Sequence, residues 1–278
     1  MKKLNGHNSN GPNLNGHAMN STKSNGQTRK QLKVVSLFTG AGGLDLGFKE
    51  AGYKCVFASD IMPQAEKTFK LNFPTTPFIC KDIRLFSKEE IKELIGDETI
   101  DVIIGGPPCQ GFSNMGNKNS SDPRNYLFED YVKIVNIIKP KCFLFENVKG
   151  ISTMFEGRFF DKIINSFLEI GYNISYSLID SSKYGVPQKR ERIIIFGSRI
   201  DRLFKFPKPN MHSFGKLSSY MNVGEAINDL INKDKIIPNH IVLKHNEIVV
   251  QRYALIEEGG KLPKPENLPV EIRRKKFW

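Results

Sequence analysis

One segment of the sequence places a thiol where a nucleophile could act. Residues 105–113 (GGPPCQGFS) put Cys109 directly after two glycines and two prolines. Because these neighbours form rigid turns and not cores, Cys109 is a candidate nucleophile. Most single cysteines are buried small hydrophobes, and that interpretation suits Cys55, Cys80 and Cys142, which lie in or beside apolar runs.

Two further segments carry charged side chains next to apolar runs. Glu146 follows residues 143–145, and burial there would raise the pKa of its carboxyl group, so that it could act as an acid near neutral pH. A helix cap or a structural ion pair is the alternative. Residues 184–192 (YGVPQKRER) precede another apolar run, and Arg190 and Arg192 point to the same side if the strand begins early. One of them could hold a phosphate or a base carbonyl, or both could belong to a solvated edge strand.

A glycine-rich turn and two acids favour a nucleoside ligand. Residues 38–44 (FTGAGGL) connect an apolar run to a helical pattern, either as a ligand-binding turn or as a plain tight connection. Asp60 follows Gly40 by twenty residues, and its carboxylate could accept two hydrogen bonds from ribose hydroxyls. A dinucleotide fingerprint would have glycine where Asp45 stands, so a nucleoside cofactor without a pyrophosphate fits better. Asp82 could hold an adenine amino group or serve as an ordinary N-cap.

These residues fall at the ends of elements that alternate between strand and helix. The expected strands are 34–38, 55–59, 78–80, 102–104, 142–145, 175–179 and 193–196. The expected helices are 44–51, 63–73, 88–95, 127–138 and 159–170. The alternation predicts an α/β fold with a doubly wound, mostly parallel sheet, whose last two strands pair as an antiparallel edge. Ligands bind beyond the carboxyl ends of such strands. The polar residues 113–125 form either a linker or a mobile lid over that site.

Composition narrows the class of protein and of partner. The 278 residues include 41 Lys plus Arg against 29 Asp plus Glu, a formal net charge of +12. Such a charge favours polyanionic partners through counterion release, although basic tails can also serve solubility alone. No apolar run approaches the roughly 18 residues of a membrane span, and no signal peptide opens the chain. The four cysteines form no CxxC pair, which argues against a structural zinc site and fits a reducing cytoplasm.

The pattern changes along the chain and predicts three parts. Residues 1–31 are rich in Asn, Gly and Ser and contain almost nothing to bury, so we expect a disordered tail. Residues 32–206 carry the alternating elements and are the expected ordered domain. Residues 207–278 lose that regularity apart from a possible helix at 223–231, and they do not look like a complete domain.

Taken together, the motifs resemble the DNA (cytosine-5-)methyltransferase family. The motifs that carry the resemblance are FTGAGGLDLGF at 38–48, Asp60, KDI at 81–83, GGPPCQGFS at 105–113, ENV at 146–148 and QKRERIIIFG at 188–197. Any one of them is weak, but six in this order and spacing make coincidence improbable. The resemblance covers about residues 32–200 and implies the Rossmann-like fold of methyltransferases that use S-adenosylmethionine. It makes residues 32–206 the expected catalytic domain and residues 207–278 an incomplete segment leading to a target-recognition region.

The resemblance also implies a chemistry. The thiolate of Cys109 adds to C6 of a cytosine extruded from double-stranded DNA, and Glu146 donates a proton to N3. C5 then takes the methyl group of S-adenosylmethionine, and loss of the C5 proton releases the thiolate. By the same resemblance, Arg190 is expected to favour the thiolate form of Cys109. Arg192, together with Glu146, is expected to hold the polar edge of the base. Residues 113–125 are expected to close over the extruded base.

The resemblance further assigns a cofactor site and a cellular role. The positions that match cofactor-binding residues are Phe38, Gly40, Gly42, Leu44, Asp60, Asp82 and Pro107. No metal and no membrane is implied. We expect a cytoplasmic bacterial protein of a restriction–modification system. Methylation of tRNA, which some relatives perform, and a non-catalytic binding protein with the same fold are the alternatives.

One departure from the family bears on activity. The variable recognition region, the Arg-rich segment after it and the late motif that completes the cofactor pocket are not found in the sequence. The chain is therefore expected to be one subunit of a split methyltransferase or a truncated form. In either case we expect little sequence-specific activity from the chain alone.

Overall fold

The computed structural model describes residues 30–108, 126–200, 204–209, 222–230, 244–257 and 259–273. Two units divide the chain, Met1–Tyr220 and Met221–Trp278, and each is described by itself. The expected disordered tail falls almost entirely outside the described residues. The expected boundary between residues 206 and 207 stays a prediction.

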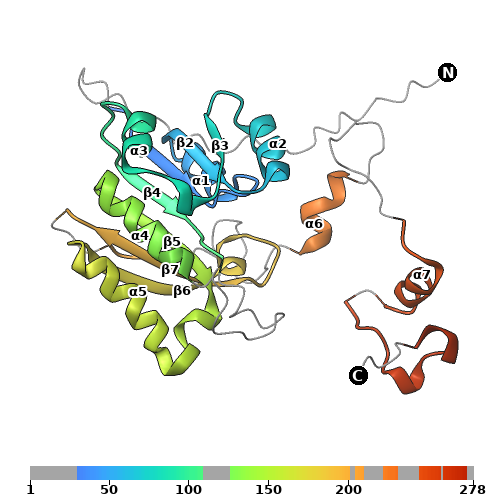
Figure 1. The fold of residues 1–278 in the computed structure, drawn as a ribbon. Helices are drawn as coiled ribbons and strands as arrows, with labels where there is room; N and C mark the ends of the chain where they lie inside the picture. Colours follow the sequence, from blue (N-terminus) through green and yellow to red (C-terminus); the bar gives the residue numbers. More distant parts are fainter. Residues whose placement is uncertain are drawn as a thin grey trace, which may run out of the picture. The chain divides into compact units, whose positions relative to one another are not determined.

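A seven-stranded sheet forms the centre of the first unit (Figure 1). Its strands are β1 (Lys33–Leu37), β2 (Lys54–Asp60), β3 (Phe78–Cys80), β4 (Val102–Gly105), β5 (Cys142–Val148), β6 (Asn173–Asp180) and β7 (Glu191–Ser198). Their order is β3-β2-β1-β4-β5-β7-β6. The first five strands pair in parallel, and β7 runs antiparallel to both β5 and β6. The doubly wound sheet with an antiparallel edge is therefore confirmed.

The helices lie close to their predicted positions. Those of the first unit are α1 (Gly43–Glu50), α2 (Pro63–Asn72), α3 (Lys88–Ile95), α4 (Leu127–Ile138) and α5 (Arg158–Glu169). Pro63 opens α2, where its missing N–H costs nothing, and the Ser87 side chain caps α3 by accepting from the Glu90 N–H. The second unit contains α6 (Val223–Ile227), which matches the start of the helix expected at 223–231, and α7 (Glu247–Ala254), which no pattern had indicated.

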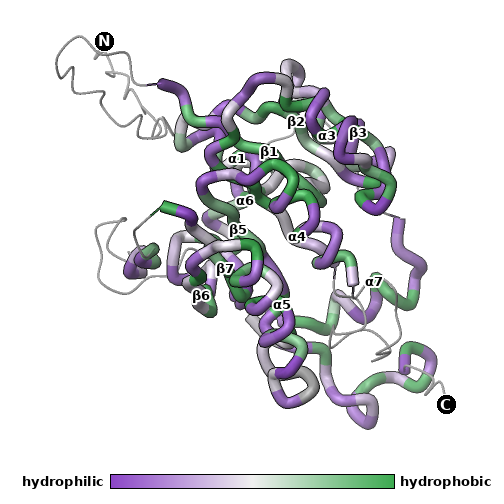
Figure 2. The backbone as a smooth tube through the Cα atoms, turned by 60° about the vertical axis from the view of Figure 1, so that its left-hand side comes forward, coloured by the Kyte–Doolittle hydropathy of each residue, from purple (hydrophilic) through white to green (hydrophobic). Residues whose placement is uncertain are grey.

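Alternate strand residues pack against different helices. Ile103, Phe143 and Ile195 belong to the large core, together with buried side chains of α3, α4 and α5. Val34 and Ile104 belong to a smaller cluster that Leu44 of α1 packs against. Figure 2 shows the hydrophobic residues along central strands such as β1 and β5. Strands buried on both faces explain why their sequences are nearly continuous apolar runs. Within the described residues, no helix has both the length and the apolar character of a membrane span.

The pairing of β5 with β7 depends on one close approach. Gly197 lies directly opposite Phe143 in the ladder, and the Phe143 ring stacks on Phe167 of α5 with a centroid distance of 4.0 Å. A Cβ atom on Gly197 would overlap the Phe143 ring, so the aromatic packing requires glycine at this position.

We predict that Gly197→Ala destabilises the protein. Overfilling a packed core costs about 1–3 kcal/mol, and urea denaturation measures that loss. Gly47→Ala is the matched control, because Gly47 is exposed on α1 and a Cβ there meets no atom within 4 Å. The control should gain roughly 0.5–1 kcal/mol from helix propensity. Equal stability of Gly197→Ala and the parent protein would contradict the packing described.

Candidate functional site

The carboxyl ends of the parallel strands surround a cavity of about 460 Å³. Asp60 ends β2, and Asp82 and Ile83 follow β3. Phe38 follows β1, and Gly106 follows β4. Apolar side chains of Ile61, Met62 and Leu127 complete much of the wall. The site thus lies where a doubly wound sheet places its ligands, with carboxylates beside apolar surface.

The glycine-rich turn is tied to the end of β2. The Gly40 N–H donates to Asp60 Oδ2 at 2.9 Å, and Gly40 and Gly42 have φ values of 55° and 89°. A Cβ on Gly42 would lie 2.5 Å from the Phe73 ring, so this turn also packs closely on α2. Neither glycine lines the cavity, and the Leu44 side chain packs against the smaller apolar cluster.

Asp60 is held with its carboxylate at the cavity. Its Oδ1 accepts from the Met62 N–H at 3.0 Å, while Oδ2 accepts from Gly40. Each carboxylate oxygen can accept more than one hydrogen bond. Capacity therefore remains for hydroxyl groups of a ligand, as the sequence predicts.

Asp82 lines the same cavity but is already engaged. Its Oδ1 accepts from the Arg84 N–H at 3.0 Å, which is the N-cap interaction considered as the alternative role. The Arg84 guanidinium also donates to it, and these hydrogen bonds lower the pKa of the Asp82 carboxyl group.

Asp45 has a role that sequence reasoning missed. Its side chain is buried and accepts hydrogen bonds from Ser36 Oγ at 2.9 Å and from the Thr39 hydroxyl. Burial raises the pKa of this carboxyl group. The acid therefore fixes the turn between β1 and α1. An acid in place of a fingerprint glycine, with Ser36 and Thr39 nearby, was the available signal.

Glu146 lies within β5 and not after it, because the strand continues to Val148. This corrects the expected strand end. The Glu146 side chain is 23% exposed, and its Oε1 lies 3.0 Å from Arg192 Nε and 3.8 Å from an Arg190 terminal nitrogen. Burial raises the pKa of the Glu146 carboxyl group even though both guanidinium groups oppose that shift. The direction agrees with the sequence analysis, and the structural ion pair considered as its alternative is present as well.

Both arginines come from the start of β7. The strand begins at Glu191, so Arg192 lies in it and Arg190 just precedes it. Val148 pairs with Arg192 in the antiparallel ladder, two residues along β5 from Glu146. Alternate residues share a face, so Glu146 and Arg192 lie on the same side of the sheet. The structure thus brings together three of the four predicted catalytic residues.

Gly106 connects this charged group to the cavity. It lines the cavity, and a Cβ on it would lie 2.9 Å from Glu146 Oε2. Pro108 also lines the cavity, whereas Pro107, the residue expected there, is not among its lining residues. The Pro107 carbonyl instead accepts from Asn147 Nδ2 at 3.0 Å. Asn147 is buried; the sequence analysis quoted it only as part of the ENV motif and did not predict this structural role.

Cys109 and the expected lid at 113–125 lie outside the described residues. Pro108 is the last described residue before them, so their roles stay predictions. Within the described part of the chain, no three His, Cys, Asp or Glu side chains gather as a metal-binding group.

Comparisons with known proteins identify the relatives of this chain. The family described as C-5 cytosine-specific DNA methylase matches residues 32–275. Type II methyltransferase M1.HphI of Haemophilus parahaemolyticus is 32% identical over 236 residues, covering 82% of this chain and 62% of that protein. Type II methyltransferase M.AquIA of Picosynechococcus is 37% identical over 219 residues, covering 71% of this chain and 88% of that protein.

A solved structure shares the fold. A protein described as a DNA modification methyltransferase encoded within an E. coli prophage superimposes with a TM-score of 0.60 at 32% identity. The superposition covers 71% of this chain and 54% of that one. The chain thus spans less than two thirds of M1.HphI and about half of this structural neighbour.

We predict that Asn147→Ala loosens the segment after β4. The change leaves the Pro107 carbonyl without its buried donor, which costs about 1–3 kcal/mol of unfolding free energy. Urea denaturation measures the loss. Asn72→Ala is the control, because exposed Asn72 also donates from Nδ2 to a carbonyl, that of Thr68, at 2.9 Å. The control should change stability by less than about 0.5 kcal/mol. If both variants lost the same free energy of unfolding, the buried hydrogen bond of Asn147 would contribute no more to stability than the exposed one of Asn72.

Proposed function

Because the chain belongs to the C-5 cytosine-specific DNA methylase family, we propose that it methylates C5 of a cytosine extruded from double-stranded DNA. The observation that carries the proposal is the junction at Gly106. Gly106 lines the cavity that also contains Asp60, and it lies against the half-buried Glu146 carboxylate, which is paired with Arg192. One subsite there suits a nucleoside cofactor, and the other suits the polar edge of a base.

The cavity has the chemistry that S-adenosylmethionine requires. Members of this family use that cofactor as their methyl donor. Asp60 would hold the ribose hydroxyls, and Phe38, Ile61 and Met62 offer apolar surface to the adenine. Asp82 would accept from the adenine amino group while it still accepts hydrogen bonds from Arg84, so we assign it a smaller contribution to cofactor binding than Asp60. S-adenosylmethionine, when bound, supplies an activated methyl group.

The chain's own residues would then prepare the base. The Cys109 thiolate adds to C6, and a thiol with an ordinary pKa near 8.5 gains from nearby positive charge such as that of Arg190. Glu146 donates a proton to N3, so negative charge does not accumulate on the ring. Arg192 holds the Glu146 carboxylate in place and faces the same polar edge.

The net charge and the relatives of the chain support a proposed partner and a proposed cellular role. A net charge of +12 favours a polyanion, and extruding one base from a duplex costs a few kcal/mol, which contacts to phosphates offset. Because its relatives are Type II methyltransferases, we place the protein in a restriction–modification system. A bacterial cytoplasmic location and a second polypeptide for target recognition complete the proposal.

Replacement of the nucleophile gives the most direct test. Cys109→Ser should abolish transfer of a labelled methyl group to unmethylated plasmid DNA and abolish covalent trapping by DNA that contains 5-fluorocytosine. Cys80→Ser is the control, since Cys80 is an exposed free thiol at the end of β3, and it should retain both activities. Survival of trapping in Cys109→Ser would exclude this nucleophile. Preference for tRNA over DNA in the same assay would favour the alternative substrate.

The pH dependence of single-turnover methylation tests the acid. Burial raises the pKa of Glu146, so the carboxyl group stays protonated to a higher pH than an ordinary glutamate, and its protonated fraction falls as pH rises through that pKa. We therefore expect the rate to fall on the alkaline side. Glu146→Gln should remove that fall and lower the rate by about 100-fold or more, because general acids contribute roughly 10²–10⁴-fold. An unchanged alkaline limb in Glu146→Gln would assign the titration to another group.

A further inference from the structure

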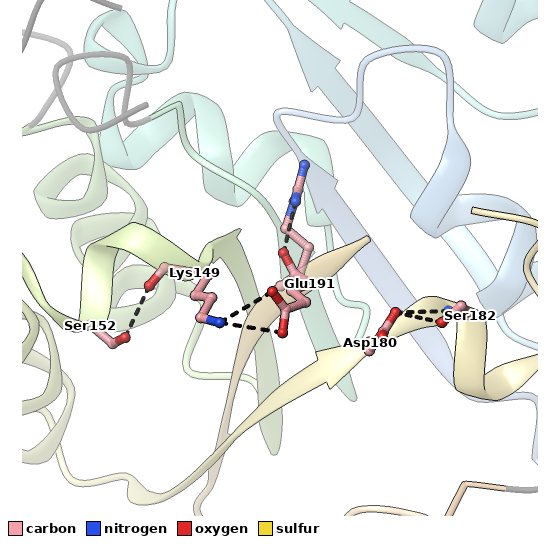
Figure 3. A network of polar contacts seen from close by, with 6 residues as sticks. Lys149, Ser152, Asp180, Ser182 and Glu191 are labelled. Carbon is pink, nitrogen blue, oxygen red and sulfur yellow. Dashed lines mark hydrogen bonds and ion pairs between the residues drawn. The ribbon is translucent and has the colours of Figure 1, made fainter. Parts of the chain in front are cut away.

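A second ion pair lies just beyond the ladder that carries Glu146 and Arg192. The ladder between β5 and β7 ends with Val148 opposite Arg192, so the next residues outward are Lys149 and Glu191. Lys149 Nζ lies 3.3 and 3.2 Å from the two carboxylate oxygens of Glu191 (Figure 3). Alternate side chains of a strand point to opposite faces, so Glu191 points away from the face that carries Arg192.

This pair contributes little to stability by itself. The side chains of Lys149 and Glu191 are 55% and 36% exposed, and exposed ion pairs are screened by water and salt. The main effect of the ion pair is therefore to fix the position of the Glu191 side chain.

The Glu191 carboxylate lies between a like charge on β6 and the Lys149 ammonium group. Asp180 lies directly opposite it on β6, and like charges in that relation repel. Asp180 is turned toward Ser182, whose N–H and hydroxyl donate to it at 3.1 and 2.8 Å (Figure 3). The ion pair with Lys149 offsets that repulsion and fixes the Glu191 side chain.

A continuous path of contacts leads from Lys149 to Glu146. The main-chain carbonyl of Glu191 accepts from an Arg192 terminal nitrogen at 2.8 Å. The same guanidinium donates through Nε to Glu146 Oε1 at 3.0 Å. The main chain of Lys149 is itself fixed, because its carbonyl accepts from Ser152 Oγ at 2.9 Å.

We infer that Lys149 is a positioning residue for Glu146. By holding the Glu191 carboxylate, it fixes the main-chain carbonyl that orients the Arg192 guanidinium against the Glu146 carboxylate. The inference rests on the proposed function, which gives Glu146 the role of proton donor. It adds a residue that touches neither base nor cofactor to the machinery of the site.

The sign of one pKa change distinguishes positioning from simple charge. Among the described residues, the charged groups against the Glu146 carboxylate are Arg192 and Arg190, and both lower its pKa; Gly106, on the β4 side, carries no charge. If charge alone mattered, Lys149→Met would raise the pKa of Glu146 and Glu191→Met would lower it. Positioning predicts that both variants raise it, because both release Arg192.

The experiment measures that pKa without requiring activity. Carbon-13 NMR follows the carboxyl groups of the full chain labelled with [13C]glutamate, and Glu146→Gln identifies the Glu146 resonance. We expect both single variants and the double variant to titrate at a higher pH than the parent, with the double variant no further displaced than the singles. The exchanged pair, Lys149→Glu with Glu191→Lys, should restore the parent titration.

A matched pair controls for the loss of any surface ion pair. Lys162 and Glu129 join α5 to α4 at 2.7 Å with side chains 51% and 49% exposed. Lys162→Met and Glu129→Met should leave the Glu146 titration unchanged. A purely structural role of Lys149 would likewise leave it unchanged.

Kinetics supply the second readout. In single-turnover methylation, Lys149→Met and Glu191→Met should each lose roughly tenfold in rate, because small displacements of reacting groups cost up to about 100-fold. Their alkaline limb should move to higher pH with the NMR titration, and cofactor affinity should not change.

The outcomes separate the two proposals. A lower pKa of Glu146 in Glu191→Met, or no change in either variant, overturns the positioning inference whatever the activity. A higher pKa in both variants supports it. If the parent protein then transfers no methyl group to any cytosine, either alone or together with a polypeptide that supplies target recognition, the proposed function fails while the contact path from Lys149 to Glu146 stands.

Discussion

The pairing of Glu146 with Arg192 is the interaction on which the chemistry of the site depends. A carboxyl group that has lost most of its water is costly to ionise, so burial raises its pKa. A guanidinium at 3.0 Å offsets part of that cost. The balance leaves the pKa of Glu146 raised but still responsive to its neighbours. A group that must give a proton and later regain it needs such a balance.

Only the reversed direction of β7 makes this pairing possible. Strands β1, β2, β4 and β5 are parallel, so their carboxyl ends lie at one edge of the sheet. If the strand beside β5 were parallel to it, the first residues of that strand would lie at the opposite edge of the sheet, far from the site. Because β7 is antiparallel, its beginning lies beside the end of β5. The antiparallel edge therefore delivers Arg190 and Arg192 to the site.

Sequence patterns predicted those features that arise from local physical chemistry. Continuous apolar runs located the seven strands, and Pro63 and Pro140 marked helix limits, because burial and backbone geometry act within a few residues. The end of β5 was missed, since Glu146 and Asn147 look like loop residues unless their partners are known. Those partners, Arg192 and the Pro107 carbonyl, are distant in sequence.

The same limit applies to the cavity. The spacing of Gly40 and Asp60 indicated a turn that faces an acid, and the structure shows the Gly40 N–H donating to that acid. The acid at position 45, with Ser36 and Thr39 nearby, was a local signal, but its burial as an acceptor for both hydroxyls became evident only in the structure. Sequence could name the residues of the site, but the hydrogen bond from Gly40 to Asp60 joins the ends of two strands that meet only in the folded sheet.

The alternation of charge at the start of β7 keeps two electrostatic groups apart. Arg190, Glu191 and Arg192 follow one another, and in solution the acid would neutralise its neighbours. In an extended strand, consecutive side chains point to opposite faces, so the sheet separates the acid from Arg192. Arg192 then meets Glu146 on one face, and Glu191 meets Lys149 at the other. A main-chain carbonyl, that of Glu191, links the two groups and transmits position without transferring charge. The site can therefore keep its two cations for the carboxylate that they must hold.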